Sequence, residues 1–264
     1  MNIFWRETKA YSKSLLFWSI GIVLLLVSGM NKFEATAAGG ELNQVIEGMP
    51  ESLQALMGAG AYDLSKASGY YGMLMLYLFF AVTIHAVTLG ANIIAKEEQD
   101  RTAEFLFTKP LSRNAIISAK ILASLLQIFI LNLVTWGSSI LIVGMYNNGE
   151  QVNDDIAVLM IGMLFLQIIF LLVGTTLASV SKRVKQAASV SSGILLAAFI
   201  LSIAIDLNER LEGLKYFTPF KYFEAKEMMY GGGLDLIYVL LSVLIIAVLL
   251  IVTFTAFRKR DLMV

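Results

Sequence analysis

The chain has 264 residues, of which 58% are hydrophobic and 15% are charged, and its 20 basic residues balance its 20 acidic ones. This composition excludes an ordinary soluble domain and indicates an integral membrane protein. The absence of cysteine and the single histidine exclude disulfides, thiolate metal sites and multi-histidine metal centres. No GxxxxGK[ST], GxGxxG or GxSxG pattern occurs, so we expect no catalytic, cofactor or metal site and no ATP bound by this chain itself.

Six long charge-free stretches are each sufficient for a helix to cross a hydrocarbon core about 30 Å thick, which takes about 20 residues. Elsewhere the longest charge-free stretch has 11 residues. We therefore predict an all-α polytopic membrane protein with six transmembrane helices, forming a single transmembrane domain over residues 1–264. The predicted spans cover residues 14–31, 69–95, 121–146, 156–181, 186–205 and 236–257.

Residues 1–13 precede the first span and have the pattern of an amphipathic helix. Phe4, Thr8, Tyr11 and Leu15 recur at spacings of three and four residues. This pattern predicts a helix lying at the membrane surface, although a simple charged flank of a signal anchor fits equally well. The first span also imitates a cleavable signal peptide, but its apolar stretch exceeds a typical h-region and the segment before it is long.

The basic residues are distributed unequally between the two sides of the predicted bundle. Fourteen of the 20 lie in the segments on the side of the two termini, and six lie in the longer segments on the other side. The positive-inside rule therefore places both termini in the cytoplasm of what we expect to be a bacterial plasma membrane. This positive face suits the anionic inner leaflet or an acidic protein partner, and we expect no nucleic-acid partner.

Of the three predicted extracellular loops, two are long, over residues 32–66 and 206–235. The first has an amphipathic pattern broken by Pro50, which predicts two short helices at the membrane surface. The second is rich in aromatic residues, which suits either a re-entrant helical hairpin or an aromatic belt that anchors the last span. Pro219 would begin the second arm of such a hairpin, where its missing N–H costs little.

The cytoplasmic loop over residues 97–119 combines charges with an apolar pair, Phe105 and Leu106, and breaks at Pro110. Helix is expected to resume after Ser112, whose side chain is suited to capping it. A short exposed helix held between two transmembrane helices could transmit force to both. The alternative is an ordinary positive-inside connector with solvated charges.

Within the predicted spans there is no Asp, Glu, Lys or Arg, which argues against ion-coupled transport. His85 has either a gating role or a structural role as a buried neutral imidazole. Spacings of small residues at Gly174-x-x-x-Ala178 and Ala188-x-x-x-Ser192 predict close helix packing. The other polar residues within the spans either form a path through the membrane or join helices by hydrogen bonds. The candidate path consists of His85, Asn92, Gln127, Asn132 and Gln167.

The chain resembles the type-2 permeases of ATP-binding-cassette transporters, the ABC-2 family. That family has an E-E-x-x-G-T-x-E-x-L-x-x-x-P-x-S-R pattern after its second span, followed by a lysine. This chain differs from the pattern at one position, where Arg101 replaces the usual glycine. The segment Met49-Pro50-Glu51-Ser52-Leu53 and the closing Phe257-Arg258-Lys259-Arg260-Asp261-Leu262 are also similar to the family. The matching residues are Glu97, Glu98, Thr102, Glu104, Leu106, Pro110, Ser112, Arg113 and, at the next helix, Lys120.

The resemblance implies the permease subunit of an ATP-driven exporter. It implies a dimer with a second copy or a paralogue, a separate cytoplasmic ATPase that binds ATP and Mg, an elbow helix over residues 1–13, and a coupling helix within residues 97–119. The alternative from the residues alone is a non-transporting membrane anchor or sensor that docks a cytoplasmic partner. By resemblance, the candidate ATPase-coupling residues are Glu98, Arg101, Thr102, Glu104, Phe105, Leu106, Lys109, Pro110 and Arg113.

Overall fold

The computed structural model describes residues 3–37, 46–57, 59, 62–99, 112–147, 149–181 and 184–259. Across these ranges the regular elements are helices and no strand occurs, and six helices are long and apolar enough to cross a membrane. The predicted six-helix, all-α class is therefore confirmed. The elements are α1 (Ile3–Ala10), α2 (Ser12–Ala37), α4 (Glu51–Met57), α5 (Ala67–Gln99), α7 (Arg113–Tyr146), α8 (Asn153–Val180), α9 (Val184–Leu207), η1 (Glu209–Phe217), η2 (Pro219–Lys221), α10 (Ala225–Met228) and α11 (Leu236–Lys259).

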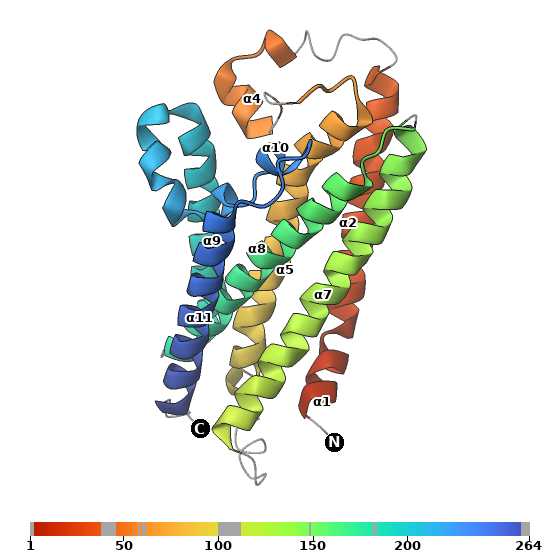
Figure 1. Ribbon diagram of the computed structural model, residues 1–264. Helices are drawn as coiled ribbons and strands as arrows, with labels where there is room; N and C mark the ends of the chain where they lie inside the picture. Colours follow the sequence, from red (N-terminus) through yellow and green to blue (C-terminus); the bar gives the residue numbers. More distant parts are fainter. Residues whose placement is uncertain are drawn as a thin grey trace.

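Both ends of the chain lie at the same end of the bundle, which we call the proximal end (Figure 1). The short helices α4 and α10 lie at the opposite, distal end. An even number of crossing helices requires this arrangement of the termini.

The membrane helices extend beyond the predicted spans, most clearly at the proximal ends of α5 and α7. The charge-free criterion stopped at Lys96 and Lys120, but the helical hydrogen-bond pattern continues to Gln99 in α5 and begins at Arg113 in α7. Ser112 caps α7 as predicted, because its Oγ accepts a 3.2 Å hydrogen bond from the backbone N–H of Ala115. The helix that resumes after Ser112 is thus the third membrane helix itself.

Helices α5 and α8 form the centre of the bundle, where two glycines bring their backbones together. A Cβ atom at Gly90 would lie 2.1 Å from the carbonyl oxygen of Leu171, and one at Gly174 would lie 2.3 Å from that of Val87. The close packing predicted for Gly174-x-x-x-Ala178 is confirmed, since Ala178 is fully buried as well. The predicted pair on α9 is shifted by one residue, because Ala187 and Ser191 are the buried ones.

The outer helices bury much less of their surface inside the chain. The apolar window of α5 is 67% buried, whereas that of α11 is 11% buried and that of α2 is 17% buried. The remaining surface of α11 and α2 is apolar and suits contact with lipid or with another membrane helix.

The distal end is covered by the aromatic segment between α9 and α11. Phe220, Tyr222 and Phe223 pack into the main core, whereas Phe217 and Tyr230 are exposed. Pro219 is the first residue of η2, which agrees with its predicted place at the start of a helical turn. The aromatic residues of this loop therefore divide between the core and the surface. Of the two short helices predicted in the first loop, α4 is present, while residues 38–45 lie outside the described residues.

Candidate functional site

Helix α1 lies against the proximal ends of α5 and α7, and we call the contact among these three helices the basal junction. The predicted amphipathic face is present, with Phe4 and Thr8 half-buried and Trp5 63% exposed. Ile3 and Glu7, one turn apart on this face, are the most deeply buried residues of α1. The inner face of α1 therefore contacts protein rather than lipid alone.

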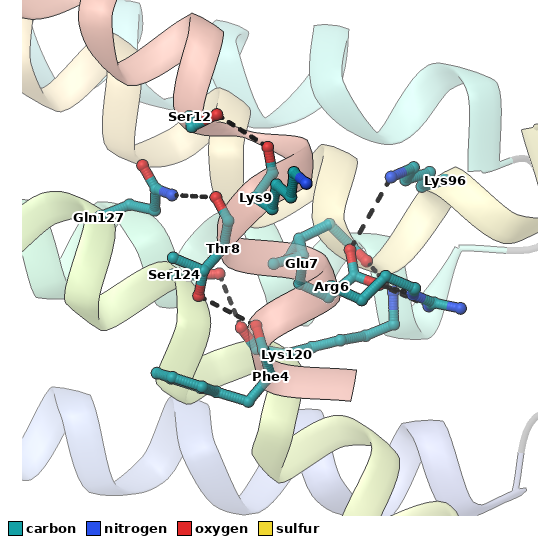
Figure 2. Close-up of polar contacts among 11 residues, drawn as sticks. Phe4, Arg6, Glu7, Thr8, Lys9, Ser12, Lys96, Lys120, Ser124 and Gln127 are labelled. Carbon is teal, nitrogen blue, oxygen red and sulfur yellow. Dashed lines mark hydrogen bonds and ion pairs between the residues drawn. The ribbon is translucent and has the colours of Figure 1, made fainter. Parts of the chain in front are cut away.

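Glu7 attaches α1 to α5 through a buried carboxylate. Its side chain is 0% exposed, its Oε1 lies 2.5 Å from Nη2 of Arg6, and its Oε2 lies 4.0 Å from Nζ of Lys96 on α5 (Figure 2). The Lys96 ammonium also lies 5.5 Å from the centre of the Tyr11 ring. Two cations thus neutralise a carboxylate that would be costly to bury alone.

Lys120 joins α7 to α5. The sequence placed this lysine among the basic residues of the connecting loop, but it lies within α7 and is 1% exposed. Its Nζ donates a 2.5 Å hydrogen bond to the carbonyl oxygen of Ile93, about one helical turn before Lys96. The Ser124 hydroxyl donates in turn to the carbonyl of Lys120 at 3.0 Å.

Gln127 provides the third contact of the basal junction by joining α7 to α1. Its Nε2 donates a 2.9 Å hydrogen bond to the backbone carbonyl of Thr8, whose hydroxyl donates to the carbonyl of Phe4 at 2.9 Å (Figure 2). Gln127 was predicted as part of an intramembrane path, whereas its contact here is with the N-terminal helix. Each pair among α1, α5 and α7 is therefore linked by at least one polar contact.

Two of the predicted coupling residues lie in the described part of the chain. Glu98 is half-buried in the last turn of α5, and Arg113 begins α7, where its Nη1 donates a 3.0 Å hydrogen bond to the carbonyl of Arg258 at the end of α11. These residues lie at the two helix ends that flank residues 100–111. Arg101, Thr102, Glu104, Phe105, Leu106, Lys109 and Pro110 lie outside the described residues.

The predicted intramembrane polar residues are only partly brought together. Asn132 donates hydrogen bonds from Nδ2 to the carbonyl of Met160 at 3.0 Å and to Oε1 of Gln167 at 3.4 Å, joining α7 to α8. His85 is buried elsewhere, with its ring 5.5 Å from that of Trp18 on α2. Asn92 is half-buried near the proximal end of α5. These separate contacts join pairs of helices, which favours the helix-joining interpretation over a continuous path.

The sequence reasoning missed Glu7, Lys96 and Lys120 as parts of one site. A usable signal existed for Glu7, because it falls one turn after Ile3 and one turn before Tyr11, on the same helical face. Within the described ranges, no group of three or more His, Cys, Asp or Glu residues is placed to hold a metal ion. The contacts of the junction attach the three helices by charge and hydrogen bonds.

A family model described as "ABC-2 family transporter protein" matches residues 1–262 of the chain. No curated protein matches it.

Proposed function

The chain belongs to the ABC-2 family of transporter proteins, as a permease subunit of an ABC transporter, and from this we propose that a separate ATPase subunit drives it as an exporter. The six apolar helices make the chain integral to the membrane. The excess of basic residues at the proximal end supports a cytoplasmic location for both termini. The ATPase would then dock at the proximal end and supply the bound ATP and Mg.

The observation that carries this proposal is the position of the basal junction directly beside the proposed coupling loop. Helix α5 ends at Gln99 and α7 begins at Arg113, so a force on the intervening residues acts on the proximal ends of both helices. Lys120 binds α5 close to that end, and Gln127 binds α1. Closure of the ATPases would therefore move α1, α5 and α7 together as one body.

The character of the contacts supports force transmission. The carboxylate of Glu7 and the ammonium of Lys120 are both buried, so separating them from their partners would leave charges without compensation. Hydrogen bonds are also electrostatically stronger in a buried site than in water. The junction thus resists opening under load, and a displacement at the loop reaches the membrane spans.

The exporter would be a dimer of permease subunits with two ATPases. The largely unburied apolar surfaces of α11 and α2 provide room for a second permease copy or paralogue as well as for lipid. A non-transporting anchor or sensor would use the same proximal end to dock its partner, but it would not respond to ATP turnover.

The test is affinity purification of the tagged chain in mild detergent from its native host, followed by ATP hydrolysis by the recovered complex. Stoichiometric recovery of an ATPase with a phosphate loop is expected. Phe105→Asp should abolish the stimulation of that ATPase by the permease while leaving membrane insertion intact, and Phe105→Leu serves as the apolar control. Recovery of the chain alone, under conditions that preserve a known transporter complex, would favour the anchor or sensor.

A further inference from the structure

A cavity of about 340 Å³ lies at the distal end, between α5, α9 and the loop helices. One part of its wall is apolar, with Met75, Leu76 and Phe79 from α5 and Ile203 from α9. Phe223 closes another side, stacked on Phe165 with ring centres 5.6 Å apart. This volume lies within the range of small-molecule sites, and the walls would bury an apolar body.

Two lysines and two carboxylates form an ion cluster at the polar side of this cavity. Nζ of Lys221 contacts Asp206 at 2.6 Å and also pairs with Glu224. Nζ of Lys226 lies 2.9 Å from Asp206 and 3.2 Å from Glu224. Each lysine is thus held between both carboxylates, and the cluster itself carries no net charge.

A second cavity, of about 780 Å³, shares the lining residues Asp206, Glu224 and Lys226 with the first, so the two cavities adjoin at the ion cluster. Glu227 and Asp235 also line it, and neither has an ion pair among the described residues. Glu227 is exposed, while Asp235 accepts a 2.8 Å hydrogen bond from the N–H of Ile237. Glu212 also lines this cavity and is paired with Lys215 at 3.0 Å, and the cluster of two lysines and two carboxylates is neutral. The carboxylates of Glu227 and Asp235 therefore give the cavity a negative net charge.

Aromatic rings face the same cavity. Tyr222 and Tyr238 both line it and are stacked, with ring centres 5.1 Å apart and planes 9° apart. Tyr216, whose ring centre lies 6.3 Å from that of Tyr238, is not among the lining residues, and Nζ of Lys215 lies 5.7 Å from its ring centre. Aromatic faces beside carboxylates are the surroundings that recognise organic ammonium groups.

We propose that these adjoining cavities bind an amphiphilic cation, a molecule with an apolar body and an amine or quaternary ammonium head. The apolar body would occupy the cavity between α5 and α9. The head would lie among Glu227, Asp235 and the Tyr222–Tyr238 pair in the larger cavity. This inference extends the proposed transport function by naming a ligand class, but the binding itself needs no ATPase.

The arrangement of charges selects against an anionic head. The ammonium groups of Lys221 and Lys226 are each engaged by two carboxylates and have little capacity left for an anion. An anionic head in the larger cavity would instead meet the unpaired carboxylates of Glu227 and Asp235. The negative head and these carboxylates would repel each other, and the repulsion would grow as the bound molecule displaces water from the cavity.

The test uses the purified full chain in phosphatidylcholine nanodiscs and a photoreactive probe, octyltrimethylammonium with a diazirine on its alkyl chain. Saturable labelling is expected on the α5 and α9 residues that line the smaller cavity. A probe with the same chain and a sulfonate head should label these residues at least about tenfold less, because it meets repulsion in place of attraction. Preference for the sulfonate, or equal labelling by both heads, would overturn the proposal.

Two variants separate binding from folding. Leu76→Trp should fill the smaller cavity and abolish the labelling. Glu227→Gln changes an exposed residue, so the fold should persist while labelling weakens by roughly fivefold, as for one close charge pair in water. Glu34→Gln, at an exposed carboxylate outside both cavities, should match the unmodified chain.

Unchanged labelling in Glu227→Gln, or labelling spread equally over α11, would overturn the proposal. Since no ATPase is present, failure here would leave the proposed coupling intact, and a missing ATPase would leave this binding intact.

Discussion

The ammonium group of Lys120 on α7 donates a 2.5 Å hydrogen bond to the backbone carbonyl of Ile93 on α5. About one turn further along α5, Lys96 faces the buried carboxylate of Glu7 on α1. One short stretch of α5 therefore holds both α7 and α1, directly before the loop that is proposed to meet the ATPase.

Lys120→Met should loosen the contact between α5 and α7 without unfolding the chain. Methionine fills similar space, and removing the ammonium also removes the cost of burying its charge, which offsets the lost hydrogen bond. We expect thermal stability in detergent to change by less than about 1 kcal/mol. Hydrogen–deuterium exchange at the proximal ends of α5 and α7 should rise, whereas the exposed-site control Lys9→Met should leave it unchanged. Equal exchange in the two variants would show that Lys120 does not hold these helices.

Glu7→Gln should weaken the attachment of α1. The substitution keeps the size of the side chain but removes the charge that faces Arg6 and Lys96. Since both cations are partly exposed and can be rehydrated, the expected loss of stability is about 1–3 kcal/mol. Thermal unfolding measures this loss, and Glu34→Gln, an exposed carboxylate on α2, provides the comparison. A loss no greater than that of Glu34→Gln would contradict a structural role for the buried carboxylate.

Gly90→Ala should force α5 and α8 apart. Its new methyl group would lie 2.1 Å from the carbonyl oxygen of Leu171, a backbone atom that cannot move independently. Overpacking of this kind typically costs about 1–3 kcal/mol. Gly137→Ala on α7 is the matched control because its methyl group meets no atom within 4 Å, and alanine favours helix over glycine by up to about 1 kcal/mol. The midpoint temperature of thermal unfolding should fall in Gly90→Ala and rise in Gly137→Ala. Shifts in the same direction would contradict the close approach of α5 and α8 at Gly90.

The distal ion cluster should give a pH dependence through Glu224. Burial raises the pKa of this carboxyl above its ordinary value, although Lys226 and Lys221 act in the opposite direction. The folded state therefore favours the protonated form more than the unfolded state does. This contribution to stability is present below the unfolded-state pKa and is lost as pH rises through the higher folded-state pKa.

The comparison of wild type with Glu224→Gln isolates that contribution. The stability of wild type relative to the variant should decrease as the pH is raised from about 4 to about 7, because the variant has no carboxyl to ionise. Thermal unfolding at several pH values measures the difference. A constant difference across this range, or one that increases with pH, would show that the buried carboxyl does not titrate as inferred.

The membrane spans could be predicted from the sequence because charge-free stretches of sufficient length report directly on the cost of burying charge in lipid. The same criterion does not locate the helix ends at Lys96 and Lys120, where α5 and α7 continue past a charge. Lys120 was left outside the third span because its charge ends the charge-free stretch, and its partner, a backbone carbonyl on another helix, has no sequence signal. The cap at Ser112 was predictable because its partner lies within the next turn.

The grouping of the site residues was less predictable. Gln127 and Asn132 look alike in the sequence, yet one contacts the backbone of Thr8 and the other contacts Met160 and Gln167. Their partners are set by which helices are neighbours, and neighbours in a helical bundle are not encoded in local periodicity. The distal cavities likewise combine α5, α9 and loop residues far apart in the chain.

The most direct test of the account is ATP hydrolysis by the complex of the full chain with its co-purified ATPase, compared between wild type and Lys120→Met. Force transmission through the basal junction predicts that the variant still binds the ATPase stoichiometrically but loses most of the permease-dependent stimulation. A loss of roughly tenfold would correspond to about 1.4 kcal/mol of coupling free energy. Lys9→Met should behave as wild type. Stimulation by Lys120→Met equal to that of Lys9→Met would contradict the account.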